Sequence, residues 1–110
     1  MAEHAAHDTG HDPFAALGDP HRRSIVELLA GGERSVGDIA ERLPISRPAV
    51  SRHLRLLEAA GLVAHRAEGN RRVYRLDRTG ADAMAAYMDA LWGEALARYR
   101  IAVENTRDGR

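Results

Sequence analysis

The stretch that most constrains the fold is residues 46–61, SRPAVSRHLRLLEAAG, which has the pattern of an amphipathic helix with marked ends. Ser46 is a good N-cap, and Pro48 is tolerated in the first turn because an N–H there has no intrahelical partner. Gly61 suits the left-handed position that follows a helix. At about 100° per residue, the apolar side chains gather on one side. This predicted core face consists of Val50, Leu54 and Leu57, with Ser46 and His53 at its margin.

The opposite side of this helix is basic and carries no acid. It consists of Pro48, Ser51, Arg52 and Arg55, with Arg47 at its border near the amino end. An acid-free arginine surface is the composition expected of a protein face that meets a polyanion. The alternative is an ordinary amphipathic helix with solvated arginines, and the flanking segments decide between the two.

Two Asp-Pro pairs, at positions 12–13 and 19–20, mark helix starts upstream. Each pair places a capping side chain before a proline at the first helical position. They predict a short helix that buries Phe14 and Leu17, and then a core helix over residues 20–30.

A third helix is predicted between these and the basic helix. Ser35 and Asp38 form a capping-box pattern, and Pro44 ends the helix that they open. Only Pro44 and Ile45 separate this helix from Ser46, so the two helices follow one another as in a helix-turn-helix. A helical hairpin in an ordinary bundle is the alternative.

Residues 62–66 and 72–76 are two short β-prone runs, and Gly69-Asn70 provides turn chemistry between them. They predict a hairpin directly after the basic helix. Arginines lie on or near its tip, namely Arg66, Arg71, Arg72 and Arg75. A hairpin in this place whose charged residues are mostly arginines is typical of a wing that lies along a DNA backbone.

The last predicted helix runs from Thr79, in a capping-box pattern with Asp82, to about Thr106. Its apolar stripe consists of Met84, Met88, Leu91, Ala95, Tyr99 and Ala102, widened by Trp92, Leu96 and Val103. A small core needs only part of this stripe, so we expect the remainder to meet a second copy. The expected homodimer contacts are Phe14, Leu17, Met88, Leu91, Trp92, Leu96 and Tyr99. The alternative is that they cover the core of their own chain.

Composition narrows the classes of function. A chain of 110 residues with 45% apolar residues supports one domain. The absence of cysteine excludes disulfides, thiolate metal sites and cysteine nucleophiles. No apolar run approaches the roughly 20 residues of a membrane span, and no signal-peptide pattern is present, so we expect a cytoplasmic protein without a membrane partner.

Net charge is zero, but the charge is unevenly distributed. Residues 46–78 hold eight arginines against three acids, a balance of +5. Residues 1–20 hold four acids and no arginine. The basic segment coincides with the predicted helix and wing, which favours nucleic acid as the partner.

Residues 1–11 are polar, small and aperiodic, and we expect a mobile tail. The tail contains His4, His7, Asp8 and His11, whose spacing is compatible with a divalent metal. Gly10 and the lack of an apolar face argue against the helix that would align them, so solvated histidines are the preferred interpretation.

Residues 12–104 resemble the ArsR family of bacterial winged-helix repressors. The most specific parts of the likeness are Ser46-Arg-Pro-Ala-Val-Ser-Arg-His-Leu, Gly61-Leu-Val and Arg72-Val-Tyr-Arg-Leu. The resemblance implies a symmetric dimer that binds an operator and blocks transcription until an effector weakens it. It also implies that Arg47, Pro48, Ser51 and Arg52 occupy the positions that meet bases.

The chain departs from many ArsR members in its sensing residues. The helix over residues 35–43 has neither the cysteine of the metal-binding motif nor a histidine, and residues 79–110 contain no histidine. Carboxylates alone suit zinc or nickel poorly. We therefore expect the metal-independent branch, with no metal site and no cofactor, and the effector is left open.

Together these patterns predict a mainly α, winged helix-turn-helix fold over residues 12–106, with five helices and a two-stranded wing. The predicted function is a dimeric repressor or autorepressor that binds an inverted-repeat operator in double-stranded DNA, with the regulated genes left open. The expected DNA contacts are Ser46, Arg47, Pro48, Ser51, Arg52, Arg55, Arg71 and Arg72.

Three other classes of function are alternatives. An enzyme needs a nucleophile, an oriented base or a phosphate-binding loop, and the sequence offers none. A metal-responsive repressor would sense through the amino-terminal histidines. A winged-helix module that docks proteins would not need a positive recognition face.

Overall fold

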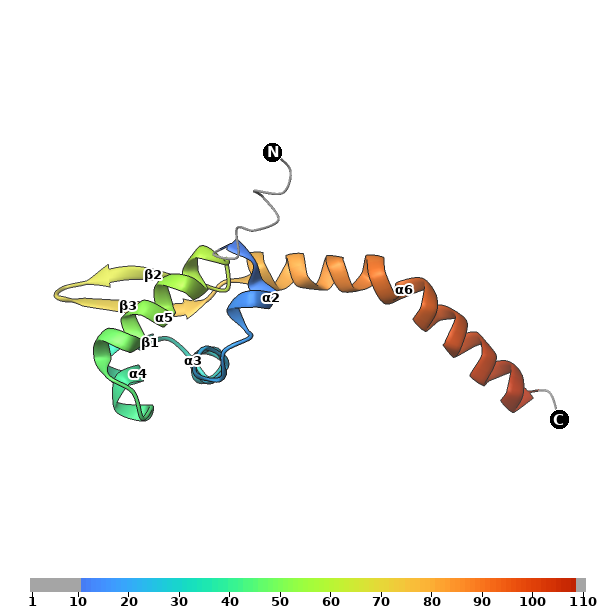
Figure 1. Ribbon diagram of the computed structural model, residues 1–110, viewed down its shortest axis with the longest axis horizontal. Helices are drawn as coiled ribbons and strands as arrows, with labels where there is room; N and C mark the ends of the chain where they lie inside the picture. The colour runs from blue at the N-terminus through green and yellow to red at the C-terminus, as the bar shows by residue number, and fades with distance from the viewer. Residues whose placement is uncertain (1–10, 109–110) are drawn as a thin grey trace.

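The computed structural model describes residues 11–108, with side chains to residue 106. Within this range it contains five helices and a three-stranded sheet (Figure 1). The elements are α2 (Pro13–Ala16), α3 (Pro20–Ala30), β1 (Arg34–Ser35), α4 (Val36–Arg42), α5 (Arg47–Ala59), β2 (Val63–Glu68), β3 (Arg71–Leu76) and α6 (Arg78–Asp108). The predicted tail, except His11, lies outside the described residues. No helix among them is both long and apolar enough to span a bilayer.

The helix starts follow the predicted caps. The Asp12 carboxylate accepts from the backbone N–H of Phe14, and that of Asp19 accepts from His21 and Arg22. The Ser35 hydroxyl accepts from the Asp38 N–H at 3.1 Å. The reciprocal half of this capping box does not form, because the Asp38 side chain pairs with Arg34 and Arg42 instead.

The sheet has one strand more than predicted. The two residues of β1 pair with Tyr74 and Val73 of β3, so the strand order is β1-β3-β2, all antiparallel. Two residues are too few to show the alternation that identifies a strand. The hairpin itself is longer than predicted, and only Gly69 and Asn70 form the turn. Gly69 has the positive φ of 62° that the first central position of such a turn favours.

The start of α6 differs from the prediction. The helix begins at Arg78, and Asp77 rather than Thr79 supplies the capping oxygen. The Asp77 Oδ1 accepts from both the N–H and the hydroxyl of Thr79, each at 3.0 Å. Asp82 takes no part in the cap and pairs with Arg78 at 3.8 Å.

Helices α2, α3, α4 and α5 and the sheet share a single apolar core. Its buried members are Ala16, Ile25, Leu29, Val36, Ile39, Val50, Leu54, Leu57, Ala60, Leu62, Val63 and Tyr74. Met84 is the α6 side chain that packs against this cluster. The carboxyl-terminal part of α6 extends away from the rest of the domain (Figure 1).

Candidate nucleic-acid interface

Helix α5 has the two faces that its sequence predicts. Val50, Leu54 and Leu57 are completely buried. Arg52 and Arg55 on the other side are exposed, and Ser51 is half-buried. The α4–turn–α5 unit therefore presents a basic face to solvent while its apolar face anchors it to the core.

The amino end of α5 is fixed by local contacts. The Ser46 hydroxyl accepts from the N–H of Ala49 at 3.2 Å, so this predicted contact residue is also the helix cap. The Arg47 guanidinium lies over α4, where its Nη1 is 3.6 Å from the point that a Cβ on Gly37 would occupy. Pro48 is exposed in the first turn.

A depression of about 210 Å³ lies between α5 and the hairpin. We call it the α5–wing depression, and it is lined by Val36, Arg47, Ser51, Asn70, Arg72 and Tyr74. Three predicted contact residues thus come together from two elements. Asn70 and Tyr74 were not among the predicted contacts, because the prediction selected only basic residues from the hairpin.

The two predicted wing residues lie on opposite sides of the hairpin, because successive side chains in a strand alternate. Arg72 faces the α5–wing depression, whereas Arg71 lines the hollow on the other side. There Arg71 and Arg66 both pair with Glu68, at 2.8 and 3.1 Å, and Arg66 reaches Glu33 at 2.7 Å. Hydrogen bonds from Arg71 and Arg66 hold the pKa of Glu68 below its ordinary value, so the carboxylate stays charged.

The arginines of the α5 face are in a different state. Within residues 11–106, no ion pair joins Arg47, Arg52, Arg55 or Arg72 to an acid. No acidic side chain in this range compensates their charge, which leaves it available for an external anion. The outer face of α5 and the inner side of the wing therefore form a cationic surface of the domain.

The structure also brings together residues that no sequence pattern connects. His53, on the inner side of α5, meets the start of α3, where its Nδ1 lies 3.2 Å from Arg22 Nη1. Asp19, His21 and His53 place ligand atoms within 4.8 Å of one another. The expectation of no metal ligands beyond the tail did not include this cluster, because a sequence separation of more than 30 residues hides it.

The apolar face of α6 is uncovered in the single chain. Leu91 is 55% exposed and Tyr99 70%, and Phe14, Met88, Trp92 and Leu96 are also exposed. Leu17 alone of the predicted dimer residues is half-buried against the core. Leu91, Trp92, Leu96 and Tyr99 therefore do not cover the core of their own chain. Met84 of the same stripe does pack against it. The short α2 does pack beside α6, with the Phe14 and Tyr87 rings 5.3 Å apart.

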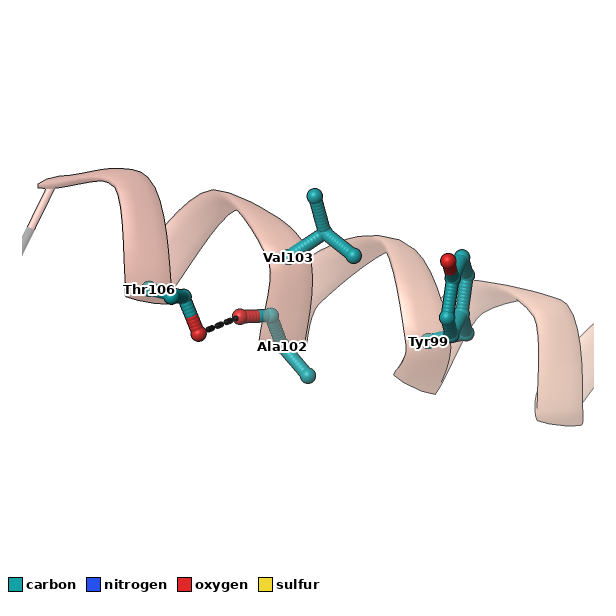
Figure 2. Close-up of a pocket in the computed structure, with 4 residues that line it drawn as sticks. All are labelled: Tyr99, Ala102, Val103 and Thr106. Carbon is teal, nitrogen blue, oxygen red and sulfur yellow. Dashed lines mark hydrogen bonds between the residues drawn. The ribbon is translucent and has the colours of Figure 1, made fainter.

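A hollow of about 400 Å³ lies far along α6, lined by Tyr99, Ala102, Val103 and Thr106. Figure 2 shows that all four side chains come from one stretch of this helix and that the Thr106 hydroxyl bonds the Ala102 carbonyl, at 2.9 Å. A hollow lined by one helix only is the space between neighbouring side chains on its surface, which no other described element of the chain fills.

Comparison with known proteins agrees with this architecture. A family model described as a helix-turn-helix domain matches residues 17–66. The HTH-type transcriptional regulator Rv2034 of Mycobacterium tuberculosis is 48% identical over 95 residues, which cover 86% of this chain and 89% of that protein. The transcriptional repressor SdpR of Bacillus subtilis is 42% identical over 66 residues, covering 60% of this chain and 73% of that one.

Among the solved structures that share this fold is a DNA-binding domain of similar sequence. It is the homodimeric winged helix-turn-helix DNA-binding domain Mb0332 of Mycobacterium bovis, a possible ArsR-family regulator, with a TM-score of 0.60 and 31% identity. The match covers 83% of this chain and 89% of that one. With the arrangement of α4, α5 and the wing, these similarities show that the chain belongs to the ArsR family of winged helix-turn-helix transcriptional regulators.

Proposed function

We propose that this protein is a homodimeric repressor that recognises an inverted-repeat operator with α5 and contacts the adjacent DNA backbone with its wing. The observation that carries the proposal is the division of the arginines. Those on the outer face of α5 and the inner side of the wing have no acidic partner within residues 11–106, whereas Arg66 and Arg71 are paired. Transcriptional repressors of similar sequence and a homodimeric DNA-binding neighbour support it.

In this proposal the α5 residues divide the work. Ser51 and Arg52, one turn inside the helix, read base edges in the major groove, where a good bidentate contact discriminates by about 1–3 kcal/mol. Arg55 and Arg72 contact phosphates, which supply affinity without sequence preference. Two α5 helices in a two-fold dimer would lie about 34–36 Å apart, one turn of DNA.

The test begins with selection of binding sites from a random DNA pool by the wild-type protein, for which we expect an inverted repeat. Affinity for the selected site and for random DNA is then compared in Arg52→Ala and Ser51→Ala. We expect both variants to discriminate less well by about 1–3 kcal/mol, since each removes a side chain that reads a base.

Arg98→Ala is the control, because Arg98 pairs with Glu94 on α6 and should not affect discrimination. An equal loss of affinity for both DNAs would make these side chains phosphate contacts. Binding that barely responds to salt would point instead to an apolar surface that docks proteins.

A further inference from the structure

Three potential metal ligands converge where the start of α3 meets the inner side of α5. They are Asp19, His21 and His53, all half-buried, with one ligand atom from each lying within 4.8 Å of the others. The His21 and His53 rings are 5.9 Å apart between centroids. The cluster lies at the contact between α3 and α5, where His53 also meets Arg22.

The Asp19 carboxylate is held in place by its own helix. Oδ1 accepts from the N–H groups of His21 and Arg22 at 2.8 and 3.1 Å, and within residues 11–106 no hydrogen bond is made by Oδ2. Burial opposes ionisation, but the backbone donors and the nearby cations hold the pKa of Asp19 below its ordinary value. The group is therefore a positioned anion with one oxygen to offer.

We propose that Asp19, His21 and His53 form a binding site for a divalent transition metal such as Zn²⁺ or Co²⁺. Two imidazole nitrogens and one carboxylate oxygen are a ligand set that favours these ions over Mg²⁺ or Ca²⁺. Bonds of about 2.1 Å in a tetrahedron place ligand atoms about 3.4 Å apart, so small side-chain rotations close the site. Water completes the coordination.

The positive charge of Arg22 lies beside this site and opposes the binding of a cation, which gives the proposal a testable consequence. Its Nη1 donates to His53 Nδ1, since a guanidinium has no acceptor, and its Nε donates to the Ala16 carbonyl at 2.6 Å. A metal ion must compete with this charge for the His53 ring. Removing the Arg22 charge should therefore tighten binding, by at least about tenfold for neighbouring like charges.

A bound ion would tie α5 to the start of α3, independently of the amino-terminal histidines. The site does not depend on DNA binding, so its failure would leave the proposed repressor function untouched. Conversely, failure of operator recognition would not affect metal binding to the free protein.

The experiment uses the full-length, untagged protein with His4→Ala, His7→Ala and His11→Ala, which removes the tail imidazoles. Co²⁺ is followed by its visible absorption and Zn²⁺ by calorimetry. We expect one ion per chain, and a Zn²⁺ excess of a hundredfold over Kd should raise Tm by roughly 10 °C.

In this background, His21→Ala should weaken binding by more than about a hundredfold, because losing even an outer partner of a ligand costs 10–100-fold. Arg22→Gln should strengthen it. His65→Ala is the matched control. His65 lies on β2 and pairs with Glu58 of α5 at 2.9 Å, so its loss should not change the affinity for metal.

Circular dichroism without metal checks that each variant is folded, and His21→Gln replaces His21→Ala if the latter is not. The proposal is overturned by an absence of saturable binding at micromolar metal. It is equally overturned if His21→Gln and His21→Ala bind as tightly as their parent.

Discussion

Neighbouring arginines in this protein have different environments because a strand alternates its side chains. Arg71 and Arg72 are adjacent in the sequence, yet Arg71 is neutralised by Glu68 at 2.8 Å and Arg72 faces the α5–wing depression. A count of basic residues treats the two alike. Only the hairpin register, with Glu68 opposite Arg71 and Ala67 opposite Arg72, separates them.

This difference predicts unequal effects on DNA binding. Arg72→Ala should weaken binding to all sequences and lower the slope of log K against log salt by about one unit for each phosphate that the variant no longer neutralises. Arg71→Ala should have a smaller effect, because Glu68 already compensates its charge. Affinity measured at several salt concentrations decides, and an equal change in both slopes would remove the distinction.

The residue-scale prediction from sequence was good wherever a periodicity carries the information. The helical period separated the buried Val50 and Leu54 from the exposed Arg52 and Arg55. It could not pair Arg66 with Glu33, which lie 33 residues apart, nor bring His53 to Arg22 across 31 residues. Such contacts depend on how elements pack, and no local pattern encodes them.

Among the elements, α6 has a start whose stability should depend on pH. The N–H and hydroxyl of Thr79 lower the pKa of Asp77 in the folded protein. A depressed carboxyl pKa gives stability that is present above the ordinary value near 3.9 and is lost as pH falls through the lower folded value.

Asp77→Asn keeps a capping acceptor but does not titrate. Helicity and Tm measured from pH 6 down to pH 2 should therefore fall more steeply in the wild type than in this variant. Because other carboxylates contribute equally to both proteins, the difference between the two curves reports Asp77. Parallel curves would contradict its role as the cap.

The contact between α5 and α6 is made by backbone, and a second prediction follows from it. Gly80 N–H donates to the Gly61 carbonyl at 2.7 Å, and a Cβ on Gly80 would lie 2.6 Å from the Ala60 oxygen. Gly80→Ala should destabilise the protein by about 1–3 kcal/mol in urea unfolding, because neither backbone can yield cheaply.

Gly93→Ala is the matched substitution in the same helix, since a Cβ there meets nothing within 4 Å. It should stabilise the chain by about 0.5–1 kcal/mol, the cost of glycine inside a helix. If Gly80→Ala were equally harmless, the close approach of the two helices would not matter for stability.

The elements themselves were largely predictable, because caps, prolines and glycines mark their ends. Asp12, Asp19, Ser35 and Ser46 all cap helices as predicted. The prediction was wrong where a neighbouring side chain supplied the cap instead, as Asp77 did in place of Thr79. It also missed an element that is stable only when it pairs with another strand. This element is β1, whose two residues are a strand only because β3 lies beside them.

At the scale of the whole molecule, the exposed stripe of α6 predicts how the protein assembles. Leu91→Glu combined with Leu96→Glu should give a soluble, helical monomer with weak binding to a half-site. Two carboxylates cannot be buried unpaired between chains. Sedimentation and circular dichroism measure both properties.

The control carries two new charges on the other side of α6, Ala90→Glu with Ala97→Glu, both at exposed positions. This variant should remain a dimer. A wild-type protein that sediments as a monomer at micromolar concentration would contradict both the dimer and the inverted-repeat operator.

The backbone contact between Gly61 and Gly80 fixes the start of α6 against the end of α5. Helix α6 is about 46 Å long at 1.5 Å per residue over its 31 residues, and this contact with the rest of the domain lies at the end of α5. A tilt of α6 about this contact would therefore change the orientation of α5 directly through backbone atoms. In the proposed dimer joined along α6, the angle between the two α6 helices would set the spacing of the two α5 helices, and with it the spacing of the operator half-sites.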